Sequence, residues 1–157
     1  VSDYLQIAAA YGYIDAEWDS GTVLPDGSAN IGGVTPPQII EDSTTVTANF
    51  QMPAFGDFDL IANLQLSHNG TMEGGKPSGG TVQNPTFTVL NIQAGLASDN
   101  WELMLNLDNA FDERYYTDIE PFPNFGFGGL IGTEPAEIII GTHGHPRLFT
   151  ASATYRF

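Results

Sequence analysis

The sequence predicts an all-β fold: an antiparallel, up-and-down sheet of about six strands that forms a segment of a transmembrane β-barrel. Three observations carry this prediction. Apolar and polar residues alternate with a period of two in six segments, as in strands that have one apolar face and one polar face. Short turns and long connections alternate between the six segments. Aromatic residues gather near the segment ends, and aliphatic residues fill the positions between them.

The composition excludes several classes of protein. The chain has 157 residues with 19 acidic and 4 basic side chains, a net charge of −15. Nucleic-acid binding through a basic patch is therefore excluded, because neutralising phosphates requires Lys and Arg. The absence of cysteine excludes a disulfide scaffold and a cysteine-ligated metal site. No apolar run approaches the ~20 residues of a membrane-spanning helix.

The first three strands in chain order are expected at residues 4–14, 44–52 and 58–67. In each of them every second residue is apolar, and the residues between are mostly polar or small. The apolar positions are Leu5, Ile7, Ala9, Tyr11 and Tyr13, then Val46, Ala48, Phe50 and Met52, then Phe58, Leu60, Ala62, Leu64 and Leu66.

The last three strands are expected at residues 90–97, 101–109 and 146–157. Met104 is the exception to their alternation, since it is apolar at a position of the polar face. We expect the six strands to account for all of the regular structure. The apolar positions are Leu90, Ile92, Ala94 and Leu96, then Trp101, Leu103, Leu105 and Leu107, then Phe149, Ala151, Ala153, Tyr155 and Phe157.

The connections between the strands fall into two classes. Residues 53–57 and 98–100 are predicted to be tight hairpin turns. Residues 17–41, 69–85 and 110–145 are long and rich in Gly, Pro, Asn and acidic residues. Loops longer than about 12–15 residues are uncommon in compact domains. A transmembrane barrel explains them, because it has short periplasmic turns and long external loops.

Aromatic residues are expected to form a girdle at each end of the strands, as in outer-membrane barrels. Phe149 and Phe157 are eight residues apart. This spans about 26 Å along a strand at ~3.3 Å per residue, or about 20 Å when tilted by ~40°, close to the ~25 Å apolar band of such barrels. The periplasmic girdle is predicted to hold Tyr4, Phe50, Phe58, Trp101, Tyr155 and Phe157, and the outer girdle Tyr11, Tyr13, Trp18, Phe87, Phe111, Tyr115, Tyr116 and Phe149.

Two motifs lie in the last part of the chain. Residues 106–115 read Asn-Leu-Asp-Asn-Ala-Phe-Asp-Glu-Arg-Tyr, and the chain ends in Tyr155-Arg156-Phe157. The first run is similar to a pattern that consists of Asn, a spacer residue, Asn-Leu-Phe-Asp and a Tyr three residues further on. This part of the chain resembles the closing strands of TonB-dependent receptors, which carry that pattern. Ala110 stands where that family usually has Leu. The resemblance covers about residues 90–157 and is only architectural over residues 1–89.

The resemblance implies that residues 1–157 are the C-terminal part of a receptor barrel of about 22 strands. The plug domain and the earlier strands are then absent from this chain. The implied function is active uptake of a scarce nutrient across the bacterial outer membrane, with a ferric siderophore as the default ligand. The implied partners are outer-membrane lipid, the barrel-assembly machinery, a small-molecule ligand and a TonB-type energy-coupling protein that acts through the missing plug region.

Three groups of residues are candidates for a functional role. An outward row on the last strand resembles the signal read by the barrel-assembly machinery, and such a strand can pair with a partner's sheet edge; the row is Phe149, Ala151, Ala153, Tyr155 and Phe157. Phe122, Phe125 and Phe127 on the longest loop either grip an apolar ligand or pack into the barrel mouth. His143 and His145, with Glu134 and Glu137 upstream, are weak candidates for a metal contact; alternatively, they are part of an acidic, glycine-rich loop end.

No catalytic constellation and no cofactor motif is visible, so the sequence does not predict an enzyme. Two other functions stay open. One is a diffusion porin or small outer-membrane barrel, which needs no plug and no energy coupling. The other is a soluble secreted carbohydrate-binding β-sandwich, in which exposed aromatic rings would bind sugars.

Overall fold

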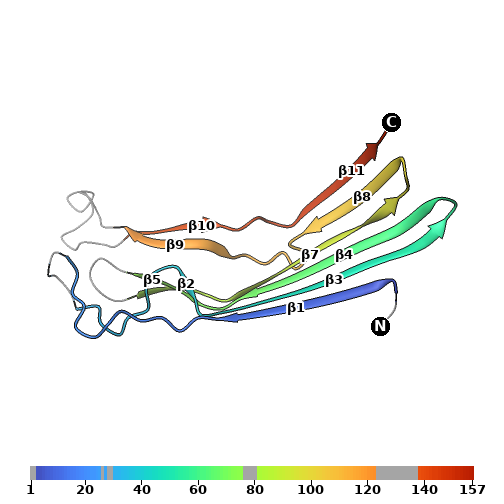
Figure 1. Cartoon of the computed structure of the whole chain (residues 1–157). Helices are drawn as coiled ribbons and strands as arrows, with labels where there is room; N and C mark the ends of the chain where they lie inside the picture. Colours follow the sequence, from blue (N-terminus) through green and yellow to red (C-terminus); the bar gives the residue numbers. More distant parts are fainter. Residues whose placement is uncertain (1–2, 26, 28–29, 76–80, 123–137) are drawn as a thin grey trace, which may run out of the picture.

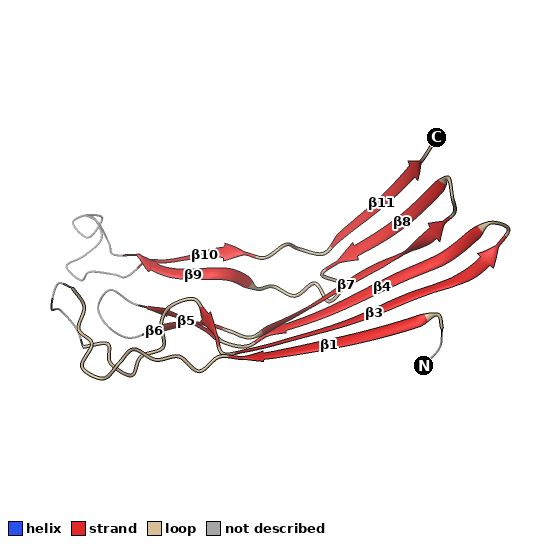
Figure 2. Cartoon of the chain, in the orientation of Figure 1, coloured by secondary structure: helices blue, strands red, loops and turns tan. Residues whose placement is uncertain are grey.

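The computed structural model describes residues 3–25, 27, 30–75, 81–122 and 138–157. Strands are the regular elements of this part of the chain (Figure 2). No helix among the described residues is long and apolar enough to cross a membrane.

The main sheet has six strands. They are β1 (Leu5–Tyr13), β3 (Asp42–Phe55), β4 (Phe58–Asn69), β7 (Phe87–Ala97), β8 (Trp101–Asp108) and β11 (Leu148–Tyr155). Their spatial order is β1-β3-β4-β7-β8-β11, and every neighbouring pair is antiparallel. Each strand therefore pairs with the next long strand along the chain, and the predicted up-and-down sheet is confirmed.

The two tight turns lie at the same end of the sheet as both chain termini, and the long connections lie at the opposite end (Figure 1). We call these the turn end and the loop end. The turn at residues 98–100 forms as predicted: the Ser98 N–H donates to the Trp101 carbonyl at 2.7 Å, and the Trp101 N–H donates to Ser98 Oγ at 3.1 Å.

The other turn is tighter than predicted. The strands continue to Phe55 and Phe58, so that only Gly56 and Asp57 connect them, with Gly56 at a φ of 57°. Pro53 lies inside β3, where the register with β4 shifts. A bulge is one of the few places in a sheet that tolerate a proline, because its missing N–H is not needed there.

The expectation that six strands account for all regular structure is wrong, because the described parts of the long connections contain five more. β2 (Ile39–Ile40), β5 (Met72–Gly75) and β6 (Thr81–Asn84) form one small sheet, and β9 (Tyr116–Phe122) pairs with β10 (Ile138–His143) in another. These strands extend beyond the loop end of the main sheet (Figure 1). Runs such as Ile138-Ile139-Ile140 lack the period of two, so the alternation did not predict them as strands. Their backbone N–H and C=O groups still need hydrogen-bond partners, which strand pairing supplies.

The register places every predicted apolar position on one face of the main sheet. One transverse row crosses all six strands, because each member is directly paired with the next. The row is Ile7, Ala48, Leu64, Ile92, Leu107 and Phe149. We call this side of the sheet the apolar face and the opposite side the polar face.

The main sheet is a single layer. In the described part of the chain the buried hydrophobic residues are only Met72, Met104 and Ile119. The accessible surface is 10840 Å², whereas a compact monomer of this mass would expose about 7,700 Å². The small sheets do not pack over the main one. No second layer among the described residues covers the apolar face, which contradicts the β-sandwich alternative.

Candidate functional site

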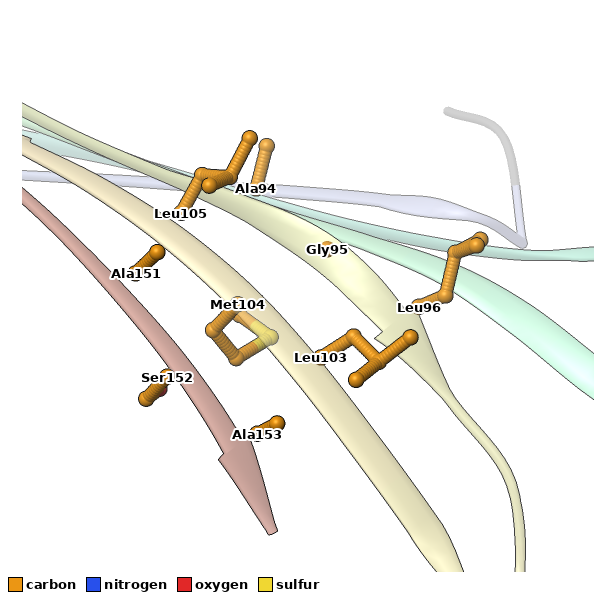
Figure 3. Close-up of a pocket in the computed structure, with 9 residues that line it drawn as sticks. All are labelled: Ala94, Gly95, Leu96, Leu103, Met104, Leu105, Ala151, Ser152 and Ala153. Atoms are coloured by element: carbon orange, nitrogen blue, oxygen red, sulfur yellow. The ribbon is translucent and has the colours of Figure 1, made fainter.

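The apolar face carries large side chains that stay exposed. Ile7 is 65% exposed, Leu105 66% and Phe149 73%. A shallow groove of about 480 Å³ lies on this face across β7, β8 and β11. Figure 3 shows Ala151 and Ala153 pointing to the groove side of β11 and Ser152 pointing away from it. A continuous exposed apolar surface of this extent is typical of a membrane-facing wall or a large interface.

Aromatic rings cluster at the turn end of the apolar face. The rings of Trp101 and Tyr155 are 4.8 Å apart between centroids, and those of Tyr155 and Phe157 are 5.0 Å apart. Phe55 and Phe58 form a further pair at 5.7 Å across the tight turn. Rings at this position suit a boundary between hydrocarbon and water, because aromatic side chains have apolar and weakly polar parts.

The predicted outer girdle is only partly correct. Tyr11 and Tyr13 are more than 60% exposed on the apolar face, but Phe87 lies on the polar face, an even number of residues before Asn91 and Gln93. Its ring stacks on Tyr115 at 4.4 Å. Phe87 belongs to β7, which begins three residues earlier than predicted.

Other members of the predicted outer girdle also lie off the sheet face. Trp18 and Phe111 are in connections rather than in strands. The ring of Tyr116 on β9 lies against that of His143 in a tilted arrangement, with 4.5 Å between the ring centroids. The aromatic residues of the loop end therefore divide between the apolar face and the connections beyond the main sheet.

The polar face is lined by amides. Directly paired residues Asn49, Asn63, Gln93, Asn106 and Thr150 form one transverse row. Asn63 Nδ2 donates to Asn49 Oδ1, and Asn106 Nδ2 donates to Thr150 Oγ1 at 3.1 Å. Gln51 Nε2 donates to Asp59 Oδ2 at 2.9 Å nearer the turn end. Such a face suits a hydrated interior.

Met104 interrupts the polar face, and the structure explains why. It is 7% exposed and pairs with Gly95 on the neighbouring strand. A Cβ atom on residue 95 would collide with the Leu103 carbonyl oxygen and with Met104 Sδ. Gly95 therefore leaves the space in which the Met104 side chain is buried.

Asn109 ties together the base of the connection between β8 and β11. It is 2% exposed with a φ of 49°, a backbone conformation that asparagine tolerates better than most residues. Its Nδ2 donates to the carbonyls of Glu113 and His145, both at 2.9 Å. Its Oδ1 accepts the Glu113 N–H at 3.0 Å, and its own N–H donates to Asn91 Oδ1 at 3.0 Å.

Two further contacts complete this base. Arg147 Nη2 lies 3.3 Å from Asp112 Oδ2. The Tyr115 ring lies between Phe87 and Gly144, where a side chain on residue 144 would collide with that ring. We call Asn109, Asp112, Tyr115 and Arg147 the loop clip. It gives the motif at residues 106–115 a structural role that its sequence does not reveal.

Asn91 and Asn84 were not predicted to have a role. Asn84 is 2% exposed at the end of β6, and its Nδ2 donates to the Tyr116 carbonyl at 2.7 Å, which joins the two small sheets. Both lie on or beside strands where an asparagine reads simply as a polar-face residue. Their hydrogen-bond partners are distant in the sequence and become visible only in the folded structure.

Among the described residues, the predicted histidines make contacts other than metal coordination. The His143 ring lies against the Tyr116 ring, and the backbone carbonyl of His145 accepts a hydrogen bond from Asn109 Nδ2. In the described part of the chain no three His, Cys, Asp or Glu side chains are grouped to hold a metal ion. Glu134 and Glu137, the predicted companions of the histidines, lie outside the described residues.

The two remaining candidate groups differ in what is described. The backbone of Phe122 ends β9, but its side chain, together with Phe125 and Phe127, lies outside the described residues. The predicted outward row of the last strand is in place: Phe149, Ala151, Ala153 and Tyr155 lie on the apolar face of β11, and Phe157 follows it. In the described sheet β11 pairs only with β8, so its second edge is open.

No protein-family model matches the chain, and no curated protein matches it. Among solved structures, the ferric-catecholate import receptor Fiu from Escherichia coli K12, in a closed form, is similar with a TM-score of 0.60 and 21% identity. The match covers 100% of this chain and 19% of the receptor chain. The chain has the fold of part of a TonB-dependent receptor barrel. At this level of identity the similarity concerns the fold alone, and it confirms the fold class predicted from the alternating strands.

Proposed function

We propose that the chain forms wall and external loops of a TonB-dependent receptor in the bacterial outer membrane, which takes up a scarce nutrient actively. In this proposal residues 1–157 are the C-terminal part of the receptor barrel. The plug domain and the earlier strands of the barrel would then belong to the remainder of the receptor. The apolar face contacts outer-membrane lipid, and the polar face lines the interior.

One observation carries the proposal: a single-layer sheet exposes a continuous apolar face, with amides on the other side. A soluble protein cannot leave such a face in water without association. Lipid around a barrel solves this problem, because the apolar side chains then face hydrocarbon and the amides face the interior. The fold similarity to an import receptor agrees with this arrangement.

The ligand we propose is a ferric siderophore. The similar structure is that of a ferric-catecholate import receptor, and the β9–β10 hairpin extends from the loop end, where a ligand would arrive. Phe122, Phe125 and Phe127 are proposed as ligand contacts on this hairpin. Energy coupling would come from a TonB-type protein acting on the plug, and insertion from the barrel-assembly machinery acting on β11.

The proposal is tested first at the gene. The reading frame upstream of Val1 should encode a plug and about 16 further strands. Cells that carry the whole gene should then accumulate radioactive iron from a ferric-catecholate complex, and a protonophore should abolish that uptake. Protonophore-resistant diffusion of small solutes would instead indicate a porin. Recovery of the protein in the aqueous fraction without detergent would contradict both membrane functions.

A further inference from the structure

A polar hollow of about 250 Å³ lies on the polar face, across four strands near the middle of the sheet. It is defined by Asn63 and Gln65 on β4, Asn91 and Gln93 on β7, Asn106 and Asp108 on β8, and Thr150 on β11. Asn63, Gln93, Asn106 and Thr150 are paired in series, and Gln65 is paired with Asn91. The side chains therefore stand next to one another, since directly paired residues have Cβ atoms about 4.5–5.5 Å apart.

The hydrogen bonds at the rim use the amide nitrogens of Asn63 and Asn106 and leave their oxygens available as acceptors. Asn63 and Asn106 each use their amide nitrogen on a neighbour, Asn49 and Thr150. Asn91 is oriented the other way, because its oxygen accepts the Asn109 N–H. Two residues with available amide oxygens, on β4 and β8, thus line the same hollow as the carboxylate of Asp108.

Asp108 has no ion-pair partner among the described residues. Arg147 pairs with Asp112 rather than with Asp108, and Arg156 pairs with Glu102 at 2.8 Å at the other end of β8. Asp108 is nevertheless half-buried between amide side chains. A half-buried carboxylate is stabilised by a charged donor, so the hollow favours a cation that can donate several hydrogen bonds.

We propose that the polar hollow binds a guanidinium group, with Asp108 as its charge partner and the oxygens of Asn63 and Asn106 as further acceptors. A guanidinium is planar and carries five N–H donors in a fixed arrangement, which matches acceptors spread over neighbouring strands. A compact ammonium reaches fewer of them. The inference rests on the proposed function for the source of the group: an arginine side chain of the polypeptide that occupies the barrel interior. A free guanidinium compound has the same chemistry.

The test uses the complete receptor, with Asp108→Asn as the variant and Asp59→Asn as the control. Asp59 is on the same face and accepts a hydrogen bond from Gln51, so the control removes a charge outside the hollow. The readout is the ion conductance of the receptor in planar bilayers as urea is added, which would rise when the interior segment unfolds. Asp108→Asn should favour the open state on the order of tenfold, the effect of losing one charge-assisted pair. Asp108→Glu should restore most of the wild-type preference for the closed state. High salt should reduce the difference between wild type and Asp108→Asn.

A second arm measures binding of arginine methyl ester to the same proteins by calorimetry. Binding that Asp108→Asn abolishes, with opening by urea unchanged, would assign the hollow to a free compound. Identical opening and no ester binding in wild type and variant would overturn the inference. A protein that forms no urea-opened barrel at all would contradict the proposed function, and the ester arm would still decide whether the hollow binds guanidinium.

Discussion

Asn109 shows how much one buried amide can organise. Its side chain satisfies three backbone groups from two chain segments, and it does so from a left-handed backbone conformation. Neither aspartate nor alanine can replace it, because the first lacks the donor and the second lacks both donor and acceptor. The loop clip depends on this residue more than on its exposed ion pair.

We expect Asn109→Ala to destabilise the base of the β9–β10 hairpin by about 2–4 kcal/mol, because backbone groups of Glu113 and His145 lose their partner in a buried place. Hydrogen exchange of the Glu113 amide should accelerate while exchange in β3 and β4 is unchanged. The matched control is Asn100→Ala, which removes an exposed bond to the Arg156 carbonyl. Equal exchange rates in Asn109→Ala and wild type would show that the clip holds without it.

Gly95 gives a second prediction at the scale of one residue. Gly95→Ala should lower the free energy of unfolding by about 1–3 kcal/mol, since the added methyl meets a backbone carbonyl and the buried Met104 sulfur. Gly12→Ala is the control, because its Cβ would lie 3.2 Å from Ser43 Oγ, a side chain that can rotate away. Urea unfolding in lipid vesicles measures the free energy of unfolding of both variants. If Gly12→Ala lowered it as much as Gly95→Ala does, the packing argument would be refuted.

At the scale of elements, the sequence predicted the long strands well and the short ones not at all. A strand such as β11 shows its two faces through the alternation from Phe149 to Tyr155, and the two faces meet different surroundings. β9 and β10 lack this contrast, and β2 has only two residues. The loop clip was equally hidden, because its bonds join Asn109 to a backbone carbonyl 36 residues away. Phe87 was misplaced because its strand start, and with it the face of its ring, was misjudged.

The two faces of β1 make a direct test of the membrane assignment. Ile7→Arg places a charge on the apolar face and should cost about 2–4 kcal/mol in a bilayer, whereas Gln6→Arg on the opposite face should cost little. Unfolding of both variants in vesicles by urea measures the difference. If Gln6→Arg proved the more harmful, the faces would have to be assigned the other way round.

The end of β11 predicts an effect on assembly. Phe157 is fully exposed beyond the strand, so removing it costs little packing. We expect Phe157→Ala to reduce the folded receptor in the outer membrane several-fold, while refolding into vesicles without cellular machinery stays normal. Arg156→Ala, which loses only a surface pair with Glu102, serves as the control. A parallel loss in vesicles would mean that the ring acts in folding rather than in recognition.

As a whole molecule, the described part of the chain is a single-layer sheet with hardly any buried hydrophobic residues. Its apolar face is exposed, and both β1 and β11 have one unpaired edge within the described sheet. Open edges with apolar faces promote association of chains. The sheet therefore needs partners at its open edges and a cover over its apolar face to be stable.

We expect the isolated chain to sediment as aggregates in aqueous buffer and to disperse in detergent. Analytical ultracentrifugation in both solvents measures this. The two edge strands should be the first to lose hydrogen-exchange protection in detergent, with β4 and β7 the last. A monodisperse monomer in plain buffer would instead revive the soluble alternative.

The alternation of tight turns and long connections has a consequence for how such a protein can change over generations. Chain separation across the three long connections is 18 residues from Asn69 to Phe87, 29 from Tyr13 to Asp42 and 40 from Asp108 to Leu148. Doubling a flexible loop adds only about 0.6 kcal/mol of closure entropy. Insertions at the loop end therefore barely affect strand pairing. The loop end can diversify while the main sheet that carries it stays the same.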